Sequence, residues 1–257
     1  MTRSTALVTG ASVGIGAAFA RALAARGDDL ILVARREDAL RALAEDLTGR
    51  HGVQATVIPL DLGAPGAAER LAAEVAAQGL TVDMLVNNAG FGLYGPFAEA
   101  DAQRVTGMLE LNVVALTALT HAFLGPMRER RRGAVINVAS VAGFQAVPGF
   151  AAYAASKAYV IGFSEALAEE VRAEGIRVQA LCPGTTATEF FEVAGMPPGA
   201  RSRFMTPEAV VEASLRGLAR GRTVVVPGPQ NWLAAHGGRL LPRAVLTRLA
   251  AIATRPE

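Results

Sequence analysis

Short apolar runs alternate with longer amphipathic stretches along the whole chain. The apolar runs predict strands at residues 6–9, 30–34, 56–59, 84–87, 134–138, 178–181 and 224–226. The stretches between them predict helices at residues 14–26, 37–48, 65–78, 101–131, 152–174 and 207–220. Strands that alternate with helices are typical of a parallel sheet, and strands without a polar face need helices on both sides. We therefore predict an α/β fold, a Rossmann-type doubly wound parallel sheet with helices on both faces.

Two segments stand apart from this alternation. Residues 185–206 are apolar but interrupted, which predicts a mobile flap, and residues 230–257 form a C-terminal tail. No linker, repeat or low-complexity block marks a second domain, so residues 1–257 are expected to form one domain.

Composition narrows the classes of protein that the chain could be. Its formal net charge of +2 does not favour nucleic-acid binding. The single cysteine, Cys182, excludes an internal disulfide and fits a reducing compartment. We see no signal peptide and no apolar run as long as a membrane span, so we expect a cytoplasmic protein. The three histidines lack ligand spacing, and no metal site is predicted.

The chain has one lysine among its 25 basic residues, and this lysine follows a tyrosine by four positions. Tyr153 and Lys157 would share one face of the predicted helix at 152–174. A nearby cation lowers the pKa of a tyrosine from about 10, so that the phenol can exchange a proton near neutral pH. The alternative is a surface tyrosine beside a solvated lysine.

A glycine-rich turn, TGASVGIG at residues 9–16, joins the first predicted strand to the first helix. Glycine allows a tight turn and lets backbone N–H groups and the helix N-terminus approach a pyrophosphate. The spacing differs from the commoner GxGxxG, and such a turn alone is weak evidence. Its place between a strand and a helix favours a dinucleotide site.

The end of the second predicted strand indicates which dinucleotide binds. An acidic residue there would bind the ribose 2′-hydroxyl of NAD, whereas an arginine suits the 2′-phosphate of NADP. Arg35 and Arg36 follow the strand, while Glu37 and Asp38 fall in the first turn of the next helix. We therefore predict NADP; the alternative is that Arg35 is a plain surface residue.

These and further motifs, in their order, resemble the NADP-preferring branch of the short-chain dehydrogenase/reductase family over nearly the whole chain. The matching motifs are Thr9-Gly10-x-x-x-Gly14-x-Gly16, Asp61-Leu62, Asn87-Asn88-Ala89-Gly90, Asn112, Ser140, Tyr153-x-x-x-Lys157 and Pro183-Gly184. The resemblance implies a seven-stranded doubly wound sheet, a nicotinamide cofactor, and proton transfer by a tyrosine to or from a carbonyl.

The resemblance also implies a role for each matching position. Ser140 would hold the substrate oxygen while Tyr153 protonates it and NADPH supplies hydride. Lys157 would bind the nicotinamide ribose and lower the pKa of Tyr153, and Asn112 would organise a water between the lysine and solvent. Alternatively, Ser140 is a turn residue at a strand end and Asn112 bonds backbone inside its helix.

The cofactor-binding residues that the resemblance and the turn together predict surround the sheet edge. They are Gly10, Ser12, Gly14, Ile15, Gly16, Arg35, Asp61, Leu62, Asn88, Ala89, Gly90, Tyr153, Lys157, Pro183, Gly184, Thr186 and Thr188. Asp61 could instead only cap a turn. The chain departs from the family at Cys182, where asparagine is usual, and at Thr186, where an apolar residue is common. We expect Cys182 to be a small buried filler.

Apolar residues in the loops that follow predicted strands suggest the substrate class. They are Phe91, Tyr94, Phe97, Phe144, Val147, Phe190 and Phe191. Such a lining favours an apolar ketone or aldehyde, or the matching alcohol, over a charged sugar. These residues could equally be routine packing, and a lipid or steroid-like compound, a 3-oxoacyl thioester and an aromatic aldehyde all stay open. A non-catalytic NADP-binding sensor or scaffold is the alternative to an enzyme.

The tail from Trp232 to Ile252 combines apolar residues with Arg239, Arg243 and Arg248. A basic amphipathic helix can lie on a membrane surface. We favour instead a tail that covers a subunit interface or its own core. The family resemblance suggests a homodimer or homotetramer built on the helices at 101–131 and 152–174.

Overall fold

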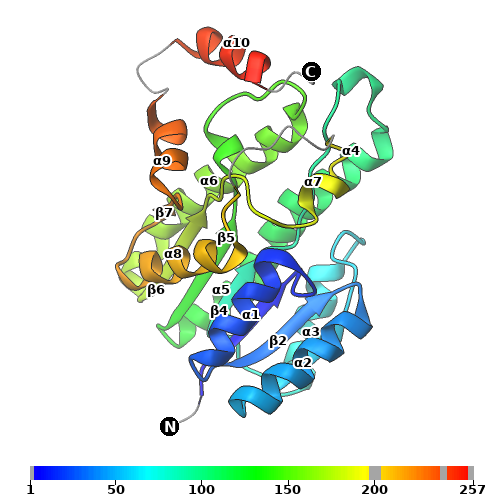
Figure 1. Ribbon diagram of the computed structural model, residues 1–257. Helices are drawn as coiled ribbons and strands as arrows, with labels where there is room; N and C mark the ends of the chain where they lie inside the picture. The colour runs from blue at the N-terminus through cyan, green and yellow to red at the C-terminus, as the bar shows by residue number, and fades with distance from the viewer. Residues whose placement is uncertain (1–2, 197–203, 238–241, 254–257) are drawn as a thin grey trace.

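The computed structural model describes residues 3–196, 204–237 and 242–253 (Figure 1). A sheet of seven parallel strands has the order β3-β2-β1-β4-β5-β6-β7. The strands are β1 (Thr5–Thr9), β2 (Asp29–Ala34), β3 (Ala55–Pro59), β4 (Met84–Asn87), β5 (Gly133–Val138), β6 (Ile176–Leu181) and β7 (Val224–Val225). The predicted α/β fold is confirmed, and each strand begins and ends within about two residues of its predicted position.

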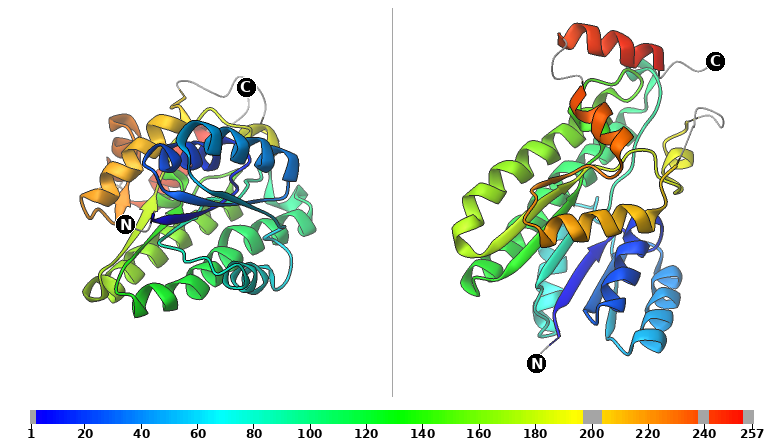
Figure 2. Two further views of the ribbon diagram at one scale, coloured as in Figure 1. Left: turned by 90° about the horizontal axis from the view of Figure 1, so that it is seen from below. Right: turned by 60° about the vertical axis from the view of Figure 1, so that its left-hand side comes forward.

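Helices cover both faces of the sheet, as the left-hand view of Figure 2 shows. One layer holds α1 (Gly14–Ala25), α2 (Glu37–His51) and α8 (Pro207–Ala219). The other holds α3 (Ala67–Ala77), α5 (Leu116–Glu129) and α6 (Ala151–Val171). Successive strand residues serve the two layers in turn: Val8 packs in the first core and Leu7 in the second. A strand buried on both faces has no reason to alternate with polar residues.

The strand order reverses at β1, which lies between β2 and β4. Ligands of open α/β sheets bind beyond the carboxyl ends of the strands at such a reversal. The glycine-rich turn after β1 and the turn at residues 88–90 after β4 both lie at this edge. The topology therefore brings two of the predicted motifs together.

The prediction of one uninterrupted helix at residues 101–131 is wrong in the middle of that range. It consists of α4 (Ala102–Leu109), a π-helical turn (Glu110–Ala115) and α5. Asp101 begins the segment because its carboxylate accepts hydrogen bonds from the N–H groups of Gln103 and Arg104, at 2.7 and 3.1 Å. Single π-helical turns are rare in proteins as a whole, but those that occur frequently lie at functional sites. This one holds Asn112.

The joined segment Ala102–Glu129 is 28 residues long and has a mean hydropathy of 1.4 in its most apolar window. By length and composition alone it could cross a membrane, so the expectation that no segment could do so was wrong. Leu119, Phe123 and Met127 are buried in the core between the helices and the sheet. We therefore interpret this segment as a helix of the core.

The elements after β6 were less completely predicted. The flap includes α7 (Phe190–Val193), and the tail forms α9 (Pro229–His236) and α10 (Arg243–Ala253) beyond the carboxyl end of the sheet (Figure 1). Three short 3₁₀ turns, Phe97–Glu99, Val141–Phe144 and Arg172–Glu174, were also not predicted. Residues 197–203 of the predicted flap and residues 238–241 and 254–257 of the tail, with Arg239, lie outside the described residues.

Candidate active site

The glycine-rich turn has the backbone geometry that a phosphate group requires. Gly10 and Gly14 have φ angles of +64° and +56°, which side chains other than glycine rarely adopt. A Cβ on Gly16 would overlap the carbonyl oxygen of Gly10. Helix α1 begins at Gly14 with no side-chain cap, so its first N–H groups face the turn. The turn fits a dinucleotide pyrophosphate, and Ser12 and Ile15 are half-buried in the same segment.

Thr9 and Asn88 connect the glycine turn to the end of β4. The Thr9 hydroxyl accepts hydrogen bonds from the N–H groups of Asn88 and Ala89, at 2.9 and 3.0 Å. The Asn88 amide donates to the carbonyl oxygens of Thr9 and Gly10, at 2.9 and 3.2 Å. These bonds hold residues 88–90 against the turn. Sequence analysis placed Asn88 and Ala89 beside the cofactor but missed the bracing role of Thr9.

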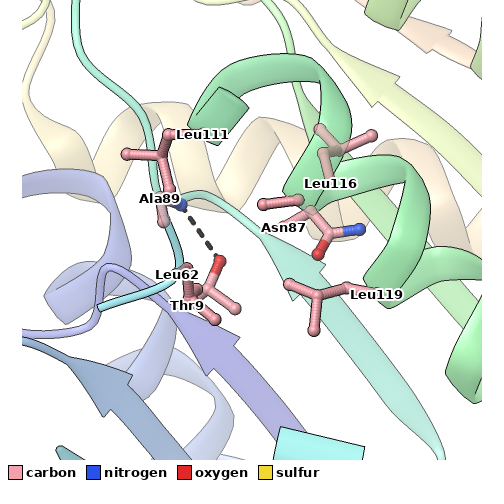
Figure 3. A pocket seen from close by; sticks show the side chains of 8 residues that line it. Thr9, Leu62, Asn87, Ala89, Leu111, Leu116 and Leu119 are labelled. Atoms are coloured by element: carbon pink, nitrogen blue, oxygen red, sulfur yellow. Dashed lines mark hydrogen bonds between the residues drawn. The ribbon is translucent and has the colours of Figure 1, made fainter. Parts of the chain in front are cut away.

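A small cavity lies behind this brace (Figure 3). Its lining is Thr9, Leu62, Asn87, Ala89, Leu111, Ala115, Leu116 and Leu119. The Asn87 amide donates to Thr120 and Asn137, both at 2.9 Å, while its Oδ1 atom has no hydrogen-bond partner among the described residues. The cavity is apolar apart from Thr9 and Asn87. We assign it to the back of the cofactor turn.

The predicted adenosine residues lie at the ends of β2 and β3. Arg35 and Arg36 are exposed, and Arg36 Nη2 lies 3.3 Å from Glu189 Oε2 of the flap. Asp61 accepts a hydrogen bond from the N–H of Gly63 at 3.0 Å and so caps a turn, while its contact with the cofactor stays a prediction. Leu62 is buried. An exposed arginine pair fits the 2′-phosphate of NADP.

Tyr153 and Lys157 lie on the buried side of α6, with side chains only 8% and 5% exposed. Lys157 Nζ donates a hydrogen bond of 2.8 Å to the carbonyl oxygen of Val138 and lies 5.8 Å from the centre of the Tyr153 ring. The Ser140 hydroxyl lies near enough to the Tyr153 phenol to influence its pKa, and it accepts a hydrogen bond from the N–H of Ala142 at 3.1 Å. The three predicted residues therefore meet, and the reading of a solvated surface pair is wrong.

The pKa values of this pair differ from the expected pattern. Burial raises the pKa of Tyr153 to about 12, and the neighbouring Ser140 hydroxyl acts in the opposite direction. Burial lowers the pKa of Lys157 to about 8. The expectation that Lys157 brings the tyrosine toward neutrality was wrong for the protein groups alone, because loss of water around the phenolate outweighs the cation. Near neutral pH the phenol is therefore protonated.

Asn112 bonds across the site rather than inside its own helix. Its amide donates to the carbonyl oxygen of Phe91 at 2.9 Å and to Ser156 Oγ at 3.3 Å, and its Oδ1 accepts from the N–H of Phe91 at 3.1 Å. Ser156 in turn donates to the carbonyl oxygen of Tyr153 at 2.6 Å. The π-helical turn thus fixes the loop after residue 90 to α6. Sequence analysis missed Ser156, which only its place between Tyr153 and Lys157 could have indicated.

Residues after β6 form the opposite wall. The carbonyl oxygen of Pro183 accepts from the N–H of Val141 at 3.0 Å, and a Cβ on Gly184 would overlap Asn231 of α9. Thr186 is buried and donates to the carbonyl oxygen of Gly184 at 3.0 Å. Asn231 donates to the carbonyl oxygen of Pro227 at 2.8 Å. Sequence analysis did not find Asn231, since no motif marks it.

Cys182 lies fully buried beneath this wall. Burial raises the pKa of its thiol to about 12, so the thiol stays protonated and unreactive near neutral pH. The structure thus agrees with the predicted role as a buried filler. Among the residues that the structure describes, no group of three or more His, Cys, Asp or Glu side chains could hold a metal ion.

Aromatic rings cover Tyr153 on the substrate side. The Tyr153 ring centre lies 5.8 Å from that of Phe150 and 5.2 Å from that of Phe190. Phe150 also contacts Tyr94 at 5.1 Å, and Phe190 contacts Phe191 at 5.3 Å. Two of the predicted lining residues do not join this cluster: Phe97 is 64% exposed, and Phe144 packs against His236, with ring centres 5.3 Å apart. The surface around the phenol is therefore apolar.

Comparison with known proteins agrees with this geometry. Residues 4–196 match the family model for short chain dehydrogenase. The 7beta-hydroxysteroid dehydrogenase of Collinsella aerofaciens is 31% identical over 235 residues, which are 90% of this chain and 88% of that protein.

Two solved structures are also similar. A short-chain dehydrogenase from Sphingobium yanoikuyae in complex with NADPH has a TM-score of 0.85 and 35% identity, covering 92% of this chain and 93% of the other. A bulky-bulky ketone specific alcohol dehydrogenase from Comamonas testosteroni has a TM-score of 0.80 and 31% identity, covering 93% of each chain. Both similarities extend over nearly the whole chain.

Proposed function

The chain belongs to the short-chain dehydrogenase family and is an oxidoreductase of alcohol and ketone groups, and from this premise we propose a specific reaction. It is the NADP(H)-dependent interconversion of an apolar ketone or aldehyde and its alcohol, with Tyr153 as general acid and base. The observation that carries the proposal is the buried contact of Ser140, Tyr153 and Lys157 at the carboxyl edge of the sheet.

In the direction of reduction, the phenol of Tyr153 donates its proton to the carbonyl oxygen of the substrate. Its raised pKa keeps the proton in place near neutral pH until the oxygen becomes basic. Ser140 lies near the Tyr153 phenol, and its hydroxyl is proposed to hold the same substrate oxygen. NADPH, when bound, supplies the hydride, and NADP⁺ accepts it in the direction of oxidation.

Lys157 stabilises the charge that this proton transfer leaves on the Tyr153 side chain. Its ammonium is held by the carbonyl oxygen of Val138 at 2.8 Å, and its cation favours the phenolate that reduction leaves behind. With a pKa of about 8 it carries its charge near neutral pH. A compact ammonium suits a single carbonyl acceptor, whereas the planar guanidinium of arginine suits bidentate partners. Ribose hydroxyls of the coenzyme are the proposed second partners of Lys157.

The proposed preference for NADP comes from the end of β2. Arg35 and Arg36 are exposed there, and neither Glu37 nor Asp38 belongs to the strand end, since both begin α2. The related structure that contains NADPH supports the same preference. The pyrophosphate is assigned to the N–H groups of the glycine turn, and Thr188, beside Gly14, to the nicotinamide end.

The proposed substrate is apolar because of the rings around Tyr153. Phe150 and Phe190 leave few polar partners for a charged or sugar-like molecule. The related proteins named for a steroid and for bulky ketones support a substrate of that size.

An assembly through the two long helices is also proposed, because Val114 and Tyr159 are 53% and 41% exposed on them. The cytoplasmic location and the role of the tail stay predictions.

The proposal is tested by Tyr153→Phe in a panel of apolar ketones, aldehydes and alcohols with NADPH or NADP⁺, followed by absorbance. We expect kcat to fall by about a thousandfold, the usual contribution of a general acid. Tyr159→Phe is the matched control. It removes a hydroxyl on the same helix that contacts Thr117 at 3.0 Å but keeps the exposed ring of the proposed assembly surface, so it should retain activity. Turnover that survives in Tyr153→Phe would refute the assignment. Tight NADPH binding without turnover in the wild type would favour a sensor instead.

A further inference from the structure

Three consecutive residues of the flap contact three different parts of the site. The Thr188 methyl carbon would lie 2.9 Å from a Cβ built on Gly14, so the flap touches the glycine turn. Glu189 pairs with Arg36 after β2, and the Phe190 ring lies 5.2 Å from the Tyr153 ring. The segment thus runs from the proposed coenzyme end to the proposed substrate end.

The ion pair of Glu189 and Arg36 differs from the other two contacts because it joins exposed, charged side chains that the core does not need. It joins residues 153 positions apart, and its nitrogen–oxygen distance is 3.3 Å. Both side chains are about half exposed, at 53% and 52%, so neither is needed by the core. No fold element requires a carboxylate at residue 189, because Glu189 only precedes the short helix α7. Its partner is the guanidinium of Arg36, one of the two exposed arginines that follow β2, where the 2′-phosphate is proposed to bind.

We propose that Glu189 is a coenzyme-specificity residue that competes with the 2′-phosphate of NADP(H) for Arg36. The inference rests on the proposed NADP preference. A carboxylate and a phosphate are both bidentate acceptors for one guanidinium, so they bind Arg36 in exchange. When the phosphate takes Arg36, the Glu189 carboxylate must move away from it. The flap therefore weakens NADP(H) binding and leaves NAD(H), which lacks the phosphate, unaffected.

The expected effect has the size of an exposed ion pair. Such pairs contribute little because solvent and salt screen them. Glu189→Gln keeps the shape of the side chain and removes its charge. We expect this variant to bind NADPH about two- to fivefold more tightly than the wild type. Its affinity for NADH should stay unchanged, and the gain for NADPH should shrink in about 1 M salt.

The experiment is a fluorescence titration of the full chain with NADPH and with NADH, which needs no substrate and no turnover. Glu212→Gln is the matched control, because Glu212 forms an exposed ion pair with Arg216 on α8, and it should change neither affinity. In an Arg36→Gln background, Glu189→Gln should lose its effect, since the competition has been removed. The unfolding midpoint of each variant, measured alongside, confirms that the fold is retained.

The possible results separate this inference from the proposed function. A wild type that binds neither coenzyme would refute both. A wild type that binds NADPH, with Glu189→Gln either unchanged or weaker for NADPH, would overturn the competition alone; weaker binding would mean that the pair instead closes the flap over the coenzyme. An equal gain for NADPH and NADH would also overturn it, because the 2′-phosphate would then have no part.

Discussion

The two sides of the site are built by different means. On the coenzyme side, backbone geometry and short hydrogen bonds fix the turns, and a Cβ at Gly16 would lie 2.6 Å from the Asn88 amide nitrogen. On the substrate side, Tyr153 is enclosed by the rings of Phe150 and Phe190, whose centres lie 5 to 6 Å away. Ring contacts depend on side-chain rotamers rather than on the course of the main chain.

This difference indicates what each side can tolerate. A backbone turn that excludes a single methyl group has little freedom to change shape, so we expect the proposed coenzyme site to be preformed. A ring cluster at a flap can repack around molecules of different outline. The same fold can therefore keep its coenzyme while its substrate changes. Three substitutions test the contrast, in order of expected effect.

The largest effect is expected from Gly16→Ala on the coenzyme side. The added methyl group overlaps the Gly10 carbonyl oxygen, so the turn must move. We expect NADPH affinity to fall by more than about a hundredfold and the unfolding free energy to fall by about 2 kcal/mol. Gly162→Ala in α6 is the control, because a Cβ there meets no atom within 4 Å. It should stabilise the helix by about 0.5–1 kcal/mol in urea unfolding.

A smaller effect is expected at the boundary of the two sides, from Lys157→Met. Burial lowers the pKa of Lys157 to about 8 in the folded chain, against about 10.4 in an unfolded one. Between these values the unfolded state binds more protons, so the lysine's contribution to stability rises with pH across this window and is lowest below pH 8. We subtract the unfolding free energy of the wild type from that of Lys157→Met. This difference should be at least about 1 kcal/mol larger at pH 7 than at pH 9.5.

Urea unfolding of both proteins at the two pH values measures this difference. The comparison cancels the other groups that titrate there, such as Cys182, whose raised pKa acts in the opposite sense in both proteins. The lost hydrogen bond to Val138 lowers the stability of the variant at both pH values. Parallel pH profiles for the two proteins would contradict the buried ammonium.

The smallest effect on the affinity for NADPH is expected from Phe190→Ala, a substitution on the substrate side. Removing this ring opens space beside Tyr153, so the KM for a bulky ketone should change by about threefold or more. NADPH affinity, measured by titration, should stay within about twofold. Phe97→Ala, at a 64% exposed ring, should change neither value. A large loss of NADPH affinity in Phe190→Ala would remove the distinction between the two sides.

The sequence predicted the strands and the glycine-rich turn well because their signals are local. The apolar runs set the strands within about two residues, and glycine spacing marked a turn whose φ angles need glycine. The motif order brought Ser140, Tyr153 and Lys157 together correctly. For the strands and the glycine turn, the physical requirement acts over a few neighbouring residues, whereas Ser140 and Tyr153 lie on different elements and were related by the order of the motifs.

What the sequence did not predict depends on contacts between distant segments. Glu189 meets Arg36 across 153 positions, and Asn231 reaches Gly184 from α9. The pKa of Tyr153 depends on how much water the rings exclude, and this pushed it upward where the sequence suggested a fall. The π-helical turn at Glu110–Ala115 leaves no mark in the apolar pattern.

That turn also divides one long helix into two rotational frames. A π-helical turn contains one residue more than an α-helical turn, which rotates everything upstream by about 100° relative to everything downstream. Met108 accordingly joins the aromatic cluster around Tyr153, while Leu119 joins the core against the sheet. Deleting a single residue between 110 and 115 would realign both halves and turn Met108 away from the phenol.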